Sequence, residues 1–372
     1  MSKLHAIRRA LPLAVAVALL ATAAACGDDD DTSAGGDGGG GDAVTVALLL
    51  PESETARYES HDKPLFEARI EEQCPDCEII YNNANQDAAD QQSQAEAALT
   101  NGADVLVLDP VDSVAAAAIV AQAEQRDVPV VSYDRLIRDA PIDFYVSYDN
   151  ERVGELQAQS LVDHLADEGV TSGSIVMING APTDNNATLF KRGAHSVLDE
   201  SDYEIGAEYD TPNWQPSEAQ REMEQAITRL GADGFVGVYA ANDGTAGGAI
   251  AAMKGAGIDP LPPVTGQDAE LAAIQRILAG EQYMTVYKAI RPEAEVAADA
   301  ALALARGEEL PEDLVNQQVD NGDGEIPSMI LDPVAVTADN VADTVIADDY
   351  WSAEEICEGD FAAACEEAGI SS

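Results

Sequence analysis

The sequence predicts an α/β protein with two Rossmann-like lobes, each a mainly parallel sheet covered by helices. Short apolar runs alternate with longer helical segments between residues 45 and 305, which is typical of buried parallel strands joined by helical crossovers. The alternation occurs twice, and polar residues follow most of the apolar runs. The chain has 372 residues, enough for two such lobes with cores of their own.

The first unit is expected to alternate four strands with three helices. Pro64 suits the first turn of the first helix, and Asn101-Gly102 suits the end of the second. The expected strands are 45–50, 78–81, 105–108 and 128–131, and the expected helices are 64–73, 87–101 and 114–125.

A further strand, 144–147, leads through Asp149-Asn150 into a long helix at 151–168. Asp and Asn are preferred at helix N-caps, so this segment is expected to start a new layer of the fold. It is the first expected crossing between the lobes.

The second unit repeats the pattern. Its expected strands are 174–178, 203–209, 234–239, a short one near Val264, and 284–287. Five helices are expected. One ends near residue 198, one runs through residue 253, and the others span 217–230, 269–279 and 292–305.

Residues 1–25 are interpreted as an export signal, because a basic start precedes an apolar run too short to cross a bilayer. Cys26 follows three alanines, which indicates a lipidation site, although position 23 holds Ala where Leu is usual. The alternative is ordinary signal-peptidase cleavage nearby. Residues 27–42 are Gly- and Asp-rich and are interpreted as a flexible tether.

The chain is strongly acidic, with 19 Lys+Arg against 69 Asp+Glu. Three of the basic residues and none of the acids lie in residues 1–25, so the mature chain would carry a net charge of −53. Such a field excludes nucleic acid and anionic lipid as partners. The excess indicates either adaptation to high salt, which we favour, or simply a solvated exported surface.

Four cysteines besides Cys26 form two local pairs, Cys74 with Cys77 and Cys357 with Cys365. A Cys-x-x-Cys can also be a redox or zinc half-site. A redox motif would start a helix, whereas this one lies between a helix and a strand, and none of the three remaining His is spaced for zinc. We therefore predict two structural disulfides in an exported protein.

Planar polar and aromatic side chains gather at the expected strand ends, where ligands of open α/β sheets bind. Such groups suit a sugar, which needs paired hydrogen bonds to its hydroxyls and rings against its C–H faces. The candidates are Arg57, Tyr58, Asp134, Arg135, Asp184, Asn185, Asn186, Trp214, Asn242, Asp268 and Lys288.

Structural roles compete with ligand binding at several positions. Asp149, Asn150 and Asp243 could equally be helix caps, Trp214 could be a core residue, and Lys288 could be solvated. The glycine-rich run 244–248 lacks the Lys of a phosphate loop and indicates close helix packing.

No metal or cofactor is expected. Residues 320–325 look like part of a calcium loop, but Val319 and Ile330 occupy the first and twelfth positions, where acids are required.

Several of these segments together resemble the bacterial D-xylose-binding proteins that feed ABC transporters. The matching segments are Tyr133-Asp-Arg, Ile142-Asp-Phe-Tyr, Asp149-Asn-Glu-Arg-Val-Gly-Glu-Leu-Gln, Asp184-Asn-Asn, Asn242-Asp-Gly-Thr-Ala-Gly-Gly-Ala-Ile, Gly266-Gln-Asp and Met284-Thr-Val-Tyr-Lys.

The resemblance implies a type I periplasmic binding fold, with one lobe at 43–148 plus 289–331 and the other at 149–288 plus 332–372. It spans about residues 44–346, so the tail from Trp351 lies outside it. The first loop, with Arg57 and Tyr58, departs most from the family.

The resemblance implies ligand contacts for Asp134, Arg135, Asp184, the Asn pair 185–186, Asn242, Asp268 and Lys288, with Trp214 stacked on the sugar. The expected function is capture of a monosaccharide, with D-xylose as the first candidate. The expected protein is a monomeric, lipid-anchored extracytoplasmic receptor that serves an ABC permease. Ribose, arabinose or glucose is the alternative ligand.

Two other classes of protein are alternatives to a transport receptor. A glycoside hydrolase would use two cleft acids, but Arg135 and Lys288 should keep those acids ionised. A sugar-responsive repressor shares the fold, but the export signal and the lack of DNA-binding helices argue against it.

Overall fold

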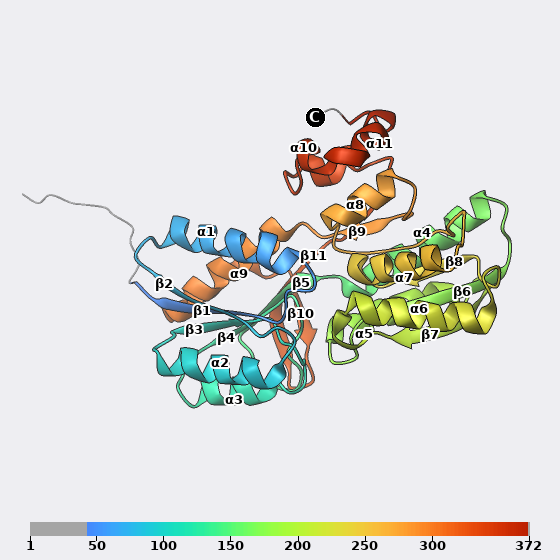
Figure 1. Cartoon of the computed structure of the whole chain (residues 1–372). Helices are drawn as coiled ribbons and strands as arrows, with labels where there is room; N and C mark the ends of the chain where they lie inside the picture. Colours follow the sequence, from blue (N-terminus) through green and yellow to red (C-terminus); the bar gives the residue numbers. More distant parts are fainter. Residues whose placement is uncertain (1–42, 371–372) are drawn as a thin grey trace, which may run out of the picture. The chain divides into compact units, whose positions relative to one another are not determined.

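The computed structural model describes residues 43–370, and it contains a seven-stranded sheet in the order β10-β11-β5-β4-β3-β1-β2 (Figure 1). All neighbouring pairs are parallel except β10 with β11. The strands are β1 (Thr45–Leu50), β2 (Glu78–Asn83), β3 (Val105–Leu108), β4 (Val130–Tyr133), β5 (Phe144–Tyr148), β10 (Gln317–Asp320) and β11 (Glu325–Leu331).

The central strands of this sheet are buried on both faces, which explains their continuous apolar sequences. Helices α1 (Lys63–Gln73) and α9 (Ile290–Ala305) cover one face, and α2 (Ala88–Thr100) and α3 (Ala117–Glu124) cover the other (Figure 1). Two apolar cores therefore lie on the two sides of the sheet.

A second sheet has the order β7-β6-β8 and is parallel throughout. Its strands are β6 (Gly173–Asn179), β7 (Tyr203–Asp210) and β8 (Gly237–Ala240). One face is covered by α4 (Asn150–Asp167) and α5 (Asn185–Leu198), and the other by α6 (Pro216–Leu230) and α7 (Asp243–Gly255). A two-stranded pair of β9 (Thr285–Tyr287) and β12 (Val334–Val336) runs antiparallel.

The glycine-rich run at the start of α7 packs closely on α6, as predicted. A Cβ on Gly248 would lie 2.2 Å from the backbone oxygen of Pro216, so only glycine allows the two helices to approach this closely. Asn242 precedes the run as the N-cap of α7.

The chain passes from one sheet to the other three times: between β5 and α4, between β9 and α9, and between β11 and β12. Tyr148, at the end of β5, donates a hydrogen bond of 2.8 Å to the backbone oxygen of Ala289, which lies in the second of these segments. Two of the connections are therefore tied together.

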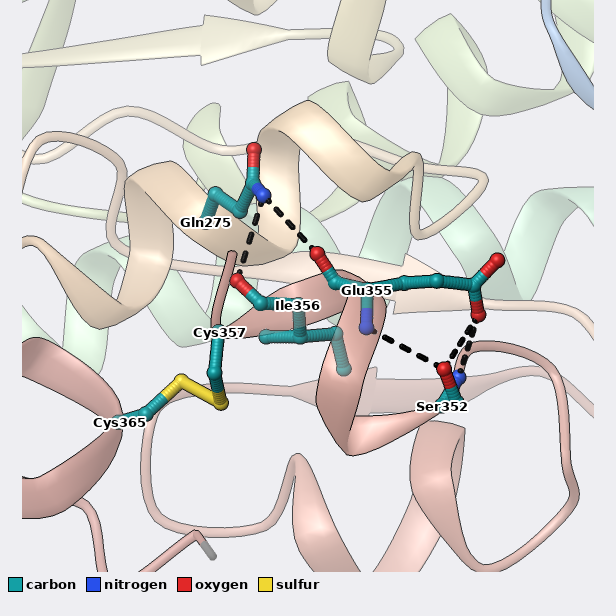
Figure 2. Close-up of a disulfide and its surroundings, with 6 residues drawn as sticks. All are labelled: Gln275, Ser352, Glu355, Ile356, Cys357 and Cys365. Carbon is teal, nitrogen blue, oxygen red and sulfur yellow. Dashed lines mark hydrogen bonds between the residues drawn. A yellow bond between two sulfur atoms is a disulfide. The ribbon is translucent and has the colours of Figure 1, made fainter. Parts of the chain in front are cut away.

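After β12 the chain forms a C-terminal segment of short helices that packs on α8 (Leu271–Leu278) (Figure 1). These are η4 (Ala342–Ile346), α10 (Ala353–Ile356), η5 (Gly359–Phe361) and α11 (Ala362–Glu367). Figure 2 shows the disulfide between Cys357 and Cys365 in this segment. Cys74 and Cys77 form the other disulfide, so both predicted pairings are present.

Some boundaries differ from the prediction. Strand β4 starts two residues late, because the backbone amide of Val128 still bonds to Ala123 at the end of the preceding helix. Helix α3 starts at Ala117, since the Asp112 carboxylate holds a separate turn before it. Val264 forms only a single bridge to Val238, not a strand.

The hairpin of β10 and β11, which was not predicted, encloses the sequence that looks like a calcium loop. Within residues 43–370, no cluster of His, Cys, Asp or Glu has the arrangement of a metal site. No helix in the same part of the chain has the length and apolarity needed to cross a bilayer.

Candidate functional site

A small polar cavity with about 20 Å³ of free space lies where the carboxyl ends of both sheets face each other. Ligand pockets span about 300 to 1,000 Å³, so in this conformation the site is nearly filled by its own side chains. Its lining residues are Thr55, Tyr58, Asp134, Arg135, Asp184, Asn186, Phe190, Trp214, Asn242, Gln267, Asp268 and Lys288.

The lining residues come from strand ends and from the helix starts that follow them. Asp134 and Arg135 directly follow β4. Asp184 is the N-cap of α5, and Asn242 is the N-cap of α7, where its Oδ1 accepts from the amide of Thr245 at 2.9 Å. A capping role and a place in the cavity are therefore compatible.

The three residues expected to be either caps or ligands do not line the cavity. Asp149 caps α4 by accepting from the amide of Arg152 at 3.0 Å. Asn150 donates to Ser147 Oγ at 3.0 Å. Asp243 is buried, and it accepts hydrogen bonds from Gln282 at 2.7 Å and from Thr285 at 2.9 Å.

Arg135 lies among three buried carboxylates. Its Nε is 3.1 Å from Asp184 Oδ2 and 3.6 Å from Asp109 Oδ1, and its Nη2 is 3.5 Å from Glu52 Oε1. Burial raises the pKa of all three acids despite the neighbouring guanidinium. Arg135 lowers each of these pKa values, but burial has the larger effect. That Arg135 keeps the cleft acids ionised at neutral pH stays a prediction.

Arg57 lies behind the cavity instead of lining it. Its Nη2 is 2.6 Å from Asp62 and 2.7 Å from Glu293, and its Nη1 is 3.3 Å from Asp134. Burial alone would raise the pKa of Asp134, but the charges of Arg57, Lys288 and Arg135 outweigh it and leave that pKa below its usual value. Arg57 thus acts on the cavity through Asp134.

Asn185 also lies outside the cavity. Its side-chain Oδ1 accepts a hydrogen bond from Arg138 Nη1 at 3.2 Å, and its backbone amide donates to Ser113 Oγ at 3.1 Å. Its neighbour Asn186 does line the cavity, and Asn186 Nδ2 donates to the backbone oxygen of Asp134 at 3.1 Å. Both asparagines therefore connect the second sheet's helices to loops of the first.

Trp214 forms an aromatic wall of the cavity. Its Nε1 donates to Asp184 Oδ2 at 3.1 Å, and its ring lies directly over Gly180, where a Cβ would come within 1.9 Å of the ring. Phe190 contributes a second ring whose centroid is 6.3 Å from that of Trp214.

Lys288 is only 3% exposed and directly follows strand β9. Its Nζ lies 3.0 Å from Asp268 Oδ1, and the rings of Tyr148 and Phe190 are 5.4 Å and 5.9 Å away. The alternative of a solvated lysine is excluded.

Two lining residues carry buried acceptor atoms that receive no hydrogen bond from the described part of the chain. These atoms are Asn186 Oδ1 and Gln267 Oε1, whereas Asp268 Oδ1 has Lys288 Nζ as its ionic partner. A buried acceptor without a donor is costly. The site is therefore complementary to a ligand that brings several hydroxyl donors.

Thr55, Phe190 and Gln267 were not predicted as lining residues. Phe190 lies on the apolar face of an amphipathic helix, so its sequence pattern matches that of an ordinary core residue. Gln267 stands between Gly266 and Asp268 in a segment that carries the family resemblance, and that match was a usable signal. Thr55 lies in the loop after β1, where no pattern distinguishes it.

A periplasmic binding protein domain model matches residues 46–309. The D-xylose-binding periplasmic protein of Escherichia coli K12 is 40% identical over 282 residues, covering 75% of this chain and 83% of that protein. The multiple sugar-binding periplasmic receptor ChvE of Rhizobium radiobacter is 34% identical, covering 73% and 81%.

A solved solute-binding protein of a carbohydrate transporter from Chloroflexus aurantiacus, in complex with D-glucose, is also similar. It has a TM-score of 0.77 and 30% identity, and the match covers 85% of this chain and 98% of that one. Sequence match and backbone similarity thus agree, and the chain belongs to the periplasmic binding protein family, with the type I fold.

Proposed function

We propose that this protein captures a monosaccharide, with D-xylose as the first candidate, and delivers it to an ABC permease. The observation that carries the proposal is the pair of partnerless acceptors on Asn186 and Gln267, beside the Asp268–Lys288 ion pair. Sugar hydroxyls would donate to them, and Arg135 and Lys288 would donate to the sugar oxygens. The rings of Trp214 and Phe190 would cover its C–H faces.

D-xylose is favoured over a hexose by the relatives. The Escherichia coli and Haemophilus influenzae proteins at 40% and 38% identity both bind D-xylose by name. Solved proteins at 30% and 29% identity hold D-glucose or β-D-glucose, which keeps glucose as the alternative.

Binding without turnover follows from the same relatives, which are transport receptors and not enzymes. We propose that the two lobes, 43–148 plus 289–331 and 149–288 plus 332–372, close around the sugar by a hinge motion at the three connections. Sugar capture would then be coupled to recognition by the permease.

Calorimetric titration with D-xylose, D-glucose, D-ribose and L-arabinose tests the ligand. We expect the tightest binding for D-xylose and a strong loss in Asp268→Asn, which keeps the shape and removes the charge facing Lys288. Asp149→Asn, at a helix cap outside the cavity, is the matched control and should bind as the parent does. Failure of all four sugars to bind would refute the proposal.

The family places the protein outside the cytoplasm. We further propose a lipid anchor at Cys26, which lies outside the described residues, and a monomeric receptor. Cys26→Ser should release the protein into the medium. A variant that stays with the membrane fraction, together with a parent that lacks a diacylglyceryl group by mass spectrometry, would contradict the anchor.

A further inference from the structure

Two consecutive residues at the edge of the cavity have left-handed backbone conformations. Asp268 has φ +91° and Ala269 has φ +50°. Residues that carry a side chain are strained in such conformations, so surrounding contacts must hold them. The conformation matters because the Asp268 carboxylate lines the cavity and faces Lys288.

The amides of this turn are held by strand β9. Asp268 N donates to the backbone oxygen of Val286 at 2.9 Å, and Ala269 N donates to Thr285 Oγ1 at 3.2 Å. These bonds fix one side of the turn.

The carbonyls of the same two residues are held by the C-terminal segment. Tyr350 OH donates to the oxygen of Asp268 at 3.2 Å, and Trp351 Nε1 donates to the oxygen of Ala269 at 2.8 Å. Two adjacent aromatic residues thus bond to two adjacent left-handed residues, some 80 positions apart in the chain.

Tyr350 is itself packed against two other aromatic side chains. Its ring stacks on His61 with centroids 4.0 Å apart, and it meets Tyr287 edge-on at 5.1 Å. Tyr287 immediately precedes Lys288, the ionic partner of Asp268. Tyr350 therefore supports both sides of the Asp268–Lys288 pair.

The chain beyond Trp351 is itself held in place by the contacts that Figure 2 shows. Ser352 and Glu355 form a capping box, and Gln275 of α8 donates to the backbone oxygens of Glu355 at 3.3 Å and Ile356 at 3.2 Å. The Ile356 side chain is buried, and the next residue, Cys357, is closed onto α11 by its disulfide. Apart from Gln275, these residues lie beyond the 46–309 region that the family model matches.

We infer that Tyr350 and Trp351 are positioning residues of the ligand site. The disulfide-closed C-terminal segment holds the 268–269 turn in its left-handed form, and so keeps the Asp268 carboxylate against Lys288 and in the cavity. The inference rests on the proposed function only for the identity of the ligand.

The first test removes single hydrogen bonds and keeps an aromatic ring at each position, in Tyr350→Phe and Trp351→Phe. Each should weaken D-xylose binding roughly two- to tenfold, the value of one net hydrogen bond. Amide hydrogen exchange at Asp268 and Ala269 in the sugar-free protein should accelerate by a similar factor. Tyr203→Phe is the matched control, because Tyr203 OH also donates to a backbone oxygen, that of Val170, far from the cavity.

The second test opens the disulfide with Cys357→Ser/Cys365→Ser. Exchange at the same two amides should accelerate and affinity should fall. The double variant Cys74→Ser/Cys77→Ser, which opens the other disulfide, should change neither.

Unchanged exchange at Asp268 and Ala269 in both Tyr350→Phe and Trp351→Phe would overturn the inference, whatever the affinities. If the parent binds none of the four sugars, the proposed function falls. The exchange measurement needs no ligand, so it would still decide whether the C-terminal segment positions this turn.

Discussion

Arg135 receives no bidentate partner within the described residues, although three carboxylates surround it. Each of Glu52, Asp109 and Asp184 lies 3.1–3.6 Å from one of its nitrogens. A buried guanidinium with loosely satisfied N–H groups is prepared to bond a ligand that presents two neighbouring oxygens.

Arg135→Lys tests this geometry, because it keeps the charge and removes the planar fork. Hydrogen bonds to charged groups contribute about 1.5–3 kcal/mol, so loss of the fork should weaken sugar binding by about a hundredfold. Calorimetry measures the affinity, and a thermal melt of the sugar-free protein checks the fold. Parent-like affinity in the variant would show that Arg135 only neutralises its acidic neighbours.

Gly180→Ala should displace Trp214 without touching any polar group of the cavity. The added Cβ would lie 1.9 Å from the indole ring, so the ring must move and lose its bond to Asp184. We expect at least a tenfold loss of sugar affinity and altered tryptophan fluorescence. Gly244→Ala is the control, since its Cβ would have 3.5 Å of clearance from Pro216. Equal affinities in the two variants would contradict the role of Gly180.

Individual site residues were predictable where a strand end and a polar side chain coincide, as for Asp134, Arg135 and Lys288. Prediction was incomplete where side-chain direction decides. Arg57 and Asn185 each neighbour a lining residue in sequence, yet both point away from the cavity to other partners. Phe190 shows the reverse case, an apolar helix residue that lines a polar site.

Among the elements, helices α4 and α5 pack unusually closely, through two glycines. A Cβ on Gly154 would lie 1.9 Å from the backbone oxygen of Phe190, and a Cβ on Gly193 would lie 1.9 Å from that of Glu151. Because α5 carries both Asn186 and Phe190, this contact sets where two lining residues stand.

Gly193→Ala should separate these two helices. Overpacking of this kind costs about 1–3 kcal/mol, which a lowered denaturation midpoint would reveal. Sugar affinity should fall as well, since Asn186 and Phe190 move with α5. Gly255→Ala at the end of α7 meets no atom within 4 Å and should leave stability equal or slightly higher. Unchanged stability in Gly193→Ala would show that the helices can shift without cost.

Element types followed from periodicity, and β1 and β3 have the predicted bounds. Errors arose where local chemistry competes with an apolar pattern. The turn held by Asp112 delays α3, and Val264 follows Pro262 and Pro263, which donate no backbone hydrogen bonds. The β10–β11 hairpin was missed, because the edge strand β10 is mostly polar and Pro327 interrupts the apolar pattern of β11.

For the molecule as a whole, acidity affects the interior as well as the surface. Burial raises the pKa of Asp243 to about 7, and it also raises the pKa values of Asp109, Glu270 and Glu293. An acid whose folded pKa exceeds its unfolded pKa favours folding most when protonated. Its contribution is complete below the unfolded pKa and is lost as pH rises through the folded pKa.

The melting temperature should therefore fall as pH rises from about 5 to 8 at constant salt. Asp243→Asn removes one such titration and should flatten part of the decline between its unfolded pKa near 4 and its folded pKa of about 7. Scanning calorimetry at several pH values in molar salt separates this effect from surface repulsion. A pH profile in Asp243→Asn identical to that of the parent would contradict the assignment.

The net charge of −50 for the whole chain gives a second, independent dependence, on ionic strength. Surface carboxylates repel one another over distances that salt shortens to about 10 Å at 0.1 M and about 3 Å at 1 M. Unfolding relieves this repulsion, so the folded state should be penalised most at low salt. The melting temperature should rise markedly between millimolar and molar potassium chloride at pH 7.

The buried ion pairs around Arg57 and Arg135 are shielded from solvent and should change little with salt. Sugar affinity should therefore vary far less than stability over the same range. A flat melting profile would indicate that the acidic surface is adequately solvated at low salt and would count against adaptation to a saline exterior.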